Sequence, residues 1–156
     1  MIVVDFEFNQ GATGREKAAK RLPFEIIEIG AVRLDEECVP AGEFTRLIRP
    51  QVFKRLHRYT KQLMRLEEGE LEKGVPFTQA AEEFFAWCGD DRLFVTWGSD
   101  DLTELQRNLA FYGLPPLDEK PFPFFDAQKL FALAFLEDKK SRISLEHAVD
   151  ALAADK

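Results

Sequence analysis

The chain has 156 residues, of which 46% are hydrophobic and 31% charged, a balance typical of one globular domain with its own core. Its two cysteines, Cys38 and Cys88, form no disulfide framework or zinc spacing, so we expect a reduced, cytoplasmic protein. No apolar run reaches membrane length, and Asp5 interrupts the region where a signal peptide would need apolar residues. The formal net charge of −7 argues at first against a nucleic-acid partner.

Three segments in the first half of the chain have the apolar pattern of β-strands. We predict strands over residues 1–8, 24–34 and 43–49. A polar loop over 9–22 and a turn at Pro40-Ala41-Gly42 separate them, and Pro50 ends the third. Their succession indicates an antiparallel meander in which the first strand is buried.

Helical spacing dominates the second half. Helices are predicted from Phe77 to Cys88, over 102–112 with Asp100 or Asp101 as the cap, over about 126–136, and over about 145–153 with Ser144 as the cap. Short helical turns are expected over 61–71, and a short strand over 92–97. A meander followed by alternating helices and strands indicates an α/β layer with a mixed sheet.

Two carboxylates interrupt the apolar first strand. Because side chains alternate along a strand, Asp5 and Glu7 point to one face with Val3, while Ile2 and Val4 point to the other. Two carboxylates on one face of a core strand are costly to desolvate unless a cation holds them. Hard oxygen ligands suit Mg²⁺ or Mn²⁺, so the pair predicts a metal site.

A second acidic pair, Asp100-Asp101, follows the apolar segment 92–97 at the predicted start of a helix. Acidic residues are common helix caps, which is the simplest interpretation of this pair alone. Together with Asp5 and Glu7, however, it predicts a cluster of three carboxylates at two strand ends. Such a cluster can bind two divalent ions that promote phosphodiester hydrolysis.

The basic residues are concentrated in one part of the chain. No Asp or Glu occurs from Phe44 to Leu66, and a second cluster follows the first strand at 15–21. A local basic patch can bind phosphates even in an acidic protein, because screening weakens distant charges. The alternative is a solvated surface segment. The basic residues of the first cluster are Arg46, Arg49, Lys54, Arg55, Arg58, Lys61 and Arg65.

These motifs resemble the DnaQ-like (DEDDh) 3′–5′ exonuclease family. Val3-Val-Asp-Phe-Glu7 is similar to its Asp-x-Glu motif, residues 24–32 to its second strand, and Trp97-Gly-Ser-Asp-Asp-Leu-Thr-Glu-Leu105 to its second motif. Residues 77–87 resemble the ERI-1/KapD-like subgroup. The resemblance implies a ribonuclease H-like mixed sheet with flanking helices, with the strand at 92–97 beside the first. It covers 1–156 as a single exonuclease-like domain.

The resemblance also implies an activity. It is the hydrolysis of phosphodiester bonds at the 3′ end of single-stranded RNA or DNA, with two Mg²⁺ or Mn²⁺ ions and a nucleoside monophosphate product. Asp5 would bridge both ions, and Glu7 and Asp101 would each support one side. Asp101 is preferred over Asp100 because Leu105 then provides the apolar residue that the family has four positions later. Glu28 is expected to be exposed or to support the metal site indirectly.

The same family suggests the residues that bind the substrate. Phe8 and Asn9 would meet the 3′-terminal nucleotide. Leu63 and Leu66 lie where relatives carry a wedge that stacks on the terminal base, and the basic segment around them could follow the phosphates.

The third motif of the family, a His followed five positions later by an Asp, has no counterpart in this chain. His57 lies in the wrong segment, and His147 has Asp150 only three positions on. We therefore expect His147 and Asp150 to be surface residues of the last helix, and the motif, with the domain's C-terminal helix, to fall beyond Lys156. The competing hypothesis is a catalytically deficient module of the same fold that binds nucleic acid or regulates.

Overall fold

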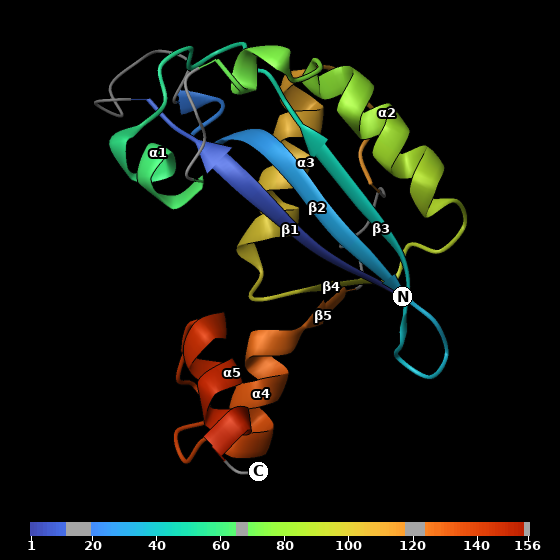
Figure 1. The fold of residues 1–156 in the computed structure, drawn as a ribbon, viewed down its shortest axis with the longest axis vertical. Helices are drawn as coiled ribbons and strands as arrows, with labels where there is room; N and C mark the ends of the chain where they lie inside the picture. Colours follow the sequence, from blue (N-terminus) through green and yellow to red (C-terminus); the bar gives the residue numbers. More distant parts are fainter. Residues whose placement is uncertain (12–19, 65–68, 118–123, 155–156) are drawn as a thin grey trace.

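The computed structural model describes residues 1–11, 20–64, 69–117 and 124–154. A five-stranded sheet with the order β3-β2-β1-β4-β5 lies at its centre (Figure 1). The antiparallel strands are β1 (Ile2–Asn9), β2 (Glu25–Leu34) and β3 (Pro40–Leu47). On the other side, β4 (Phe94–Thr96) runs parallel to β1, and β5 (Phe124–Asp126) runs parallel to β4. The predicted mixed sheet is therefore confirmed.

Helices join the strands of this sheet. Those between β3 and β5 are α1 (Arg58–Met64), the short 3-10 turn η2 (Leu71–Lys73), α2 (Phe77–Cys88) and α3 (Asp100–Phe111). After β5 come α4 (Ala127–Phe135) and α5 (Leu145–Ala154). Over the described ranges, no helix is long and apolar enough to cross a membrane.

The core lies between one face of the sheet and the helices α2 and α3. Ile2, Val4 and Phe6 of β1 are at most 4% exposed, and Phe6 meets Phe84 of α2 in an edge-on ring contact. Between them Val3 is 38% exposed, so the opposite face of the strand is open to solvent. The prediction from the alternating pattern, that Val3 lies on the face opposite Ile2 and Val4, is therefore confirmed.

The predicted turn at Pro40-Ala41-Gly42 is wrong, because these residues begin β3. The turn lies earlier, where the carboxylate of Asp35 accepts from the backbone N–H groups of Glu37 and Val39. β3 is an edge strand, and a proline at the first position of an edge strand leaves no ladder hydrogen bond unmade.

Two further boundaries differ from the prediction. Residues 124–126 form β5 beside β4, although no strand was predicted there and the next helix was predicted to begin near Asp126. Asp100 and Asp101 lie in the first turn of α3, and Ser99 takes the N-cap position, so neither aspartate is the cap. Ser144, in contrast, does cap α5, since its Oγ accepts from the backbone N–H of His147.

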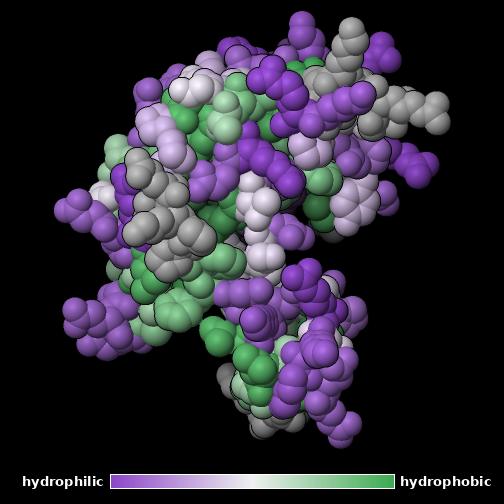
Figure 2. Space-filling model, turned by 180° about the vertical axis from the view of Figure 1, so that it is seen from behind, coloured by the Kyte–Doolittle hydropathy of each residue, from purple (hydrophilic) through white to green (hydrophobic). Residues whose placement is uncertain are grey.

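The helices α4 and α5 form a smaller lobe that is set off from the main body (Figures 1 and 2). Much of its apolar surface is open, since Leu133 on α4 and Val149 on α5 are each more than half exposed. The other large exposed hydrophobic residues of this lobe are Leu130, Phe135, Leu145 and Leu152. The main body therefore holds the larger core, and the lobe buries little of its own.

Candidate active site

Carboxylates from three elements lie close enough to affect one another's pKa. Asp5 and Glu7 come from β1, Glu28 of β2 lies directly across from Glu7 in the ladder, and Asp101 comes from the first turn of α3. The negative charge of Asp5 raises the pKa of Glu7, of Glu28 and of Asp101. These four residues are called the acidic cluster below.

The path from β4 into α3 positions Asp101. β4 pairs with β1 only at Ile2 and Val3 and ends at Thr96, so it does not continue along the later part of β1. The chain then turns at Gly98, whose φ of 97° favours glycine, and enters α3. Asp101 consequently comes within range of the backbone N–H of Phe6, which lowers its pKa, while Asp100 is exposed.

The electrostatics of the acidic cluster are unbalanced. Burial raises the pKa of Asp101 most, followed by repulsion from Asp5, and the result is about 7. Loss of surrounding water is also the main cause that raises the pKa of Asp5, Glu7 and Glu28. Among the described residues, no Lys, Arg or His lowers the pKa of these four groups. The negative charge of the cluster is therefore not compensated by any cation among the described residues.

A hollow opens beside Asp5. The residue opposite Asp5 in the ladder is Gly30, so no side chain covers the carboxylate from β2. The hollow measures about 250 Å³, and its outer wall is made by Glu43 and Thr45 of β3. Asp5 thus retains access to solvent although packing removes part of its water.

The chemistry of these donors fits a hard divalent cation, since all are carboxylate oxygens without a competing positive partner. Their present geometry is not yet that of a bound ion. Within the described ranges, no three acidic, His or Cys side chains converge tightly enough to hold a metal. Binding an ion would therefore draw the carboxylates of Asp5, Glu7 and Asp101 together.

The predicted substrate-binding residues lie in different environments. Phe8 is half-buried and packs against the rings of Phe6 and Phe24. Leu63 on α1 is 54% exposed, and Leu66 lies outside the described residues. The exposed Leu63 is thus free to meet a ligand.

Asn9 does not fit a contact between its side chain and a nucleotide. It is fully buried, and its amide Nδ2 donates to the backbone carbonyls of Phe53 and Arg55. Its Oδ1 accepts from the backbone N–H of His57. Its burial was not foreseen, because a polar residue at the end of a strand resembles a surface residue, whereas a segment more than 40 positions later covers this one.

Neither histidine has a hydrogen bond to the acidic cluster among the described contacts. The Nδ1 of His57 is 3.3 Å from the Nε2 of Gln10, beyond the end of β1. His147 and Asp150 are exposed on α5, as predicted, and His147 contacts Ser144. None of these groups contributes to the pKa of the four clustered carboxyls.

The position of Glu28 directly opposite Glu7 was not predicted from the sequence. The available signal was the strand register, because an antiparallel pairing places a β2 carboxylate opposite Glu7. A bulge complicates this register, since β2 holds one extra residue between the partners of Glu7 and Phe8. Bulges leave no clear trace in the amino-acid pattern.

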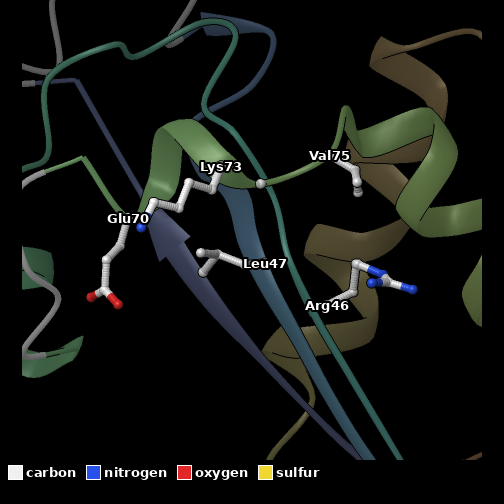
Figure 3. A pocket seen from close by; sticks show the side chains of 6 residues that line it. Arg46, Leu47, Glu70, Lys73 and Val75 are labelled. Atoms are coloured by element: carbon white, nitrogen blue, oxygen red, sulfur yellow. The ribbon is translucent and has the colours of Figure 1, made fainter.

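A second hollow, of about 270 Å³, lies at the outer edge of the sheet, between β3 and η2 (Figure 3). Arg46 points away from the other labelled side chains there, and its guanidinium pairs with Glu83 at 2.5 Å. This hollow contains none of the acidic cluster. It is lined by Arg46, Leu47, Glu70, Lys73, Gly74 and Val75.

A family model described as Exonuclease (RNase_T) matches residues 2–154, which is nearly the entire chain. The chain therefore belongs to this exonuclease family, and the DnaQ-like resemblance of its motifs agrees with that membership. No curated protein matches the sequence significantly.

Solved nucleases share the fold. Cell-death related nuclease 4 (CRN-4) has a TM-score of 0.74 at 16% identity over 99% of this chain and 54% of its own. The nuclease domain of 3′hExo, a DEDDh family member bound to rAMP, has a TM-score of 0.70 at 18% identity over 88% of this chain and 71% of its own. E. coli Exonuclease I in complex with an oligonucleotide has a TM-score of 0.62 at 10% identity over 89% of this chain and 30% of its own. The chain thus spans about half of the first of these, and the ribonuclease H-like fold is confirmed.

Proposed function

We propose that this protein is a 3′–5′ exonuclease that removes nucleoside monophosphates from single-stranded RNA or DNA with two Mg²⁺ or Mn²⁺ ions. The observation that carries the proposal is the uncompensated acidic cluster in a chain of the exonuclease family. Structural carboxylates normally have cationic partners, whereas no described cation lowers the pKa of these four and the charge of Asp5 raises the pKa of the other three. Such a cluster suits a site that awaits a cation.

Asp5, Glu7 and Asp101 are the residues that would hold the ions. When bound, the ions supply activation of water and stabilisation of charge on the scissile phosphate. Asp5 takes the central place, because its charge acts on each of the other carboxyls. Asp101, with a pKa of about 7, is only partly ionised near neutral pH, and a bound cation would favour its ionised form.

The substrate side of the proposal rests on exposed groups near the end of β1. Leu63 offers an apolar surface for the terminal base. The cations of segment 54–61 can follow the phosphates of a single strand. Among the similar structures, one is described as 3′-end recognition of a histone mRNA stem-loop by a 3′-exonuclease, which agrees with a 3′-end substrate here.

Strand shortening tests the proposal. Single-stranded RNA and DNA labelled at the 5′ end are incubated with the protein and Mg²⁺ or Mn²⁺, and the products are separated by length. Stepwise shortening from the 3′ end is expected, together with its loss in Asp5→Asn and its retention in Glu36→Gln, an exposed carboxylate of the β2–β3 turn. Products that arise from internal cuts would contradict the exonuclease assignment.

A catalytically deficient nucleic-acid-binding module is the second candidate. It is favoured by the described geometry, in which no three side chains form a complete ligand set. The two candidates separate in one assay, because the module would bind the labelled strand and leave its length unchanged in both metals.

A further inference from the structure

The irregular segment between β3 and α1 lies near the end of β1, and exposed cations occur both on this segment and on α1. Lys54, Arg55, Arg58 and Lys61 are all exposed, and they are called the basic ledge below. Within the part of the chain that the structure describes, none of the four forms an ion pair with an acidic side chain. The basic ledge is therefore available to an anionic ligand.

Glu25, at the start of β2, holds the beginning of this segment. It is only 1% exposed, and its Oε1 accepts from the backbone N–H groups of Gln51 at 2.6 Å and Val52 at 2.9 Å. Its Oε2 accepts from the N–H of Phe53 at 2.8 Å, and the hydroxyl of Tyr112 donates to Oε1 at 3.0 Å. A buried carboxylate is stable when N–H and O–H donors surround it in this way.

Asn9, the ladder partner of Glu25, holds the rest of the segment. Its Nδ2 donates to the carbonyls of Phe53 at 2.7 Å and Arg55 at 3.1 Å, and its Oδ1 accepts from the N–H of His57 at 2.8 Å. The two buried side chains thus fix the backbone at 51, 52, 53, 55 and 57. The basic side chains of 54, 55 and 58 leave from, or directly beside, these fixed points.

The basic ledge lies close to the acidic cluster. Asn9 follows Glu7 by two residues on β1, a backbone separation of about 7 Å in an extended strand. The hydroxyl of Thr60 donates to the carbonyl of Phe8 at 2.9 Å, which ties α1 to the same strand end. The basic ledge therefore lies within reach of a strand whose 3′ end occupies the acidic cluster.

We propose that Glu25 and Asn9 are positioning residues that hold the basic ledge in place to bind the phosphates upstream of the 3′-terminal nucleotide. The inference rests on the proposed function. A loose loop would lose conformational entropy on binding a strand, and the six hydrogen bonds from these side chains remove that cost in advance. Neither side chain touches the substrate itself.

The test measures binding in the absence of metal, so that it does not depend on catalysis. A 5′-fluorescent single-stranded 12-mer is titrated in EDTA between about 50 and about 200 mM KCl, and the logarithm of affinity is plotted against that of salt. Neutralising two phosphate contacts with Lys54→Gln/Arg55→Gln is expected to reduce the slope by about 1.4. Glu25→Gln and Asn9→Ser are expected to weaken binding about fivefold at 100 mM KCl and to reduce the slope likewise.

The matched control is Tyr112→Phe, which removes one hydrogen bond from Glu25 and leaves those to the segment intact. It is expected to keep the wild-type slope. In the Lys54→Gln/Arg55→Gln background, Glu25→Gln and Asn9→Ser are expected to cause a smaller loss than in the wild type, because only Arg58 and Lys61 of the basic ledge remain.

Two results would overturn the inference. One is a wild-type salt slope in both folded variants, with folding checked by circular dichroism. The other is an equal loss of affinity with and without the two basic side chains, which would mark a merely structural role. Failure of the proposed function looks different, since the strand would then bind with the expected slope and remain uncut.

Discussion

The acidic cluster and the basic ledge are neighbours at the end of β1, yet the chain builds them in opposite ways. The cluster sits on regular elements, and its carboxylates repel one another without a compensating cation among the described residues. Half of the basic ledge, Lys54 and Arg55, sits on an irregular segment whose backbone is held by Asn9 and Glu25, and the other half sits on the first turns of α1. The comparison separates two tasks: the cluster awaits a cation for the chemistry, and the basic ledge awaits an anion for binding.

The largest effect is expected at the centre of the acidic cluster. Asp5→Asn should lower kcat by about 10³-fold or more, because it removes the group that acts on every other carboxyl. In EDTA the same variant should melt at a higher temperature than the wild type, because the repulsion is relieved. A variant with wild-type kcat would exclude the cluster as the active site.

The basic ledge should respond in KM instead. Arg58→Gln/Lys61→Gln is expected to raise KM for a single-stranded substrate about tenfold and to change kcat less than about twofold, because it removes only phosphate attraction. Lys139→Gln/Lys140→Gln, in the exposed connection between α4 and α5, is the matched control and should change neither constant. A fall in kcat with an unchanged KM would contradict the assignment of substrate binding to the basic ledge and of chemistry to the acidic cluster.

Substitution of Glu28 should weaken metal binding and have a smaller effect than substitution of Asp5. Glu28→Gln keeps the shape of the side chain and removes a charge next to Glu7, so we expect the Mn²⁺ concentration for half-maximal activity to rise about tenfold. The measurement is a metal titration of the cleavage rate. An unchanged half-point would place Glu28 outside the site.

The smallest effect is expected at Leu63, which is exposed and belongs to neither charged group. Leu63→Ala should raise KM about fivefold if a base packs on the side chain, since about 1 kcal/mol of apolar contact is lost. Steady-state kinetics on substrates that differ only in the terminal base would check this. An equal KM in the variant would remove Leu63 from the substrate path.

Local patterns predicted much of this molecule, and long-range contacts explain what they missed. The alternation of Ile2, Val3 and Val4 identified the open face of β1, because strand periodicity is local. β5 escaped notice because its three residues become a strand only beside β4. The burial of Asn9 was not foreseen because its partners lie more than 40 residues later. Charge and spacing suggested Asp101, but the backbone turn that brings it to Phe6 is visible only in the fold.

The most direct test of the central claim is the melting temperature as a function of pH, in EDTA and in Mn²⁺, for the wild type and Asp101→Asn. Folding raises the pKa of Asp101 from 3.8 to about 7, so the native state binds more protons than the unfolded state in that interval. Without metal, the stability that this group contributes is full below about pH 4 and is lost as pH rises through about 7. We predict this decline in EDTA, a smaller one in Asp101→Asn, and its reversal by Mn²⁺, which binds the deprotonated cluster. Identical pH profiles in EDTA and Mn²⁺ would contradict the account.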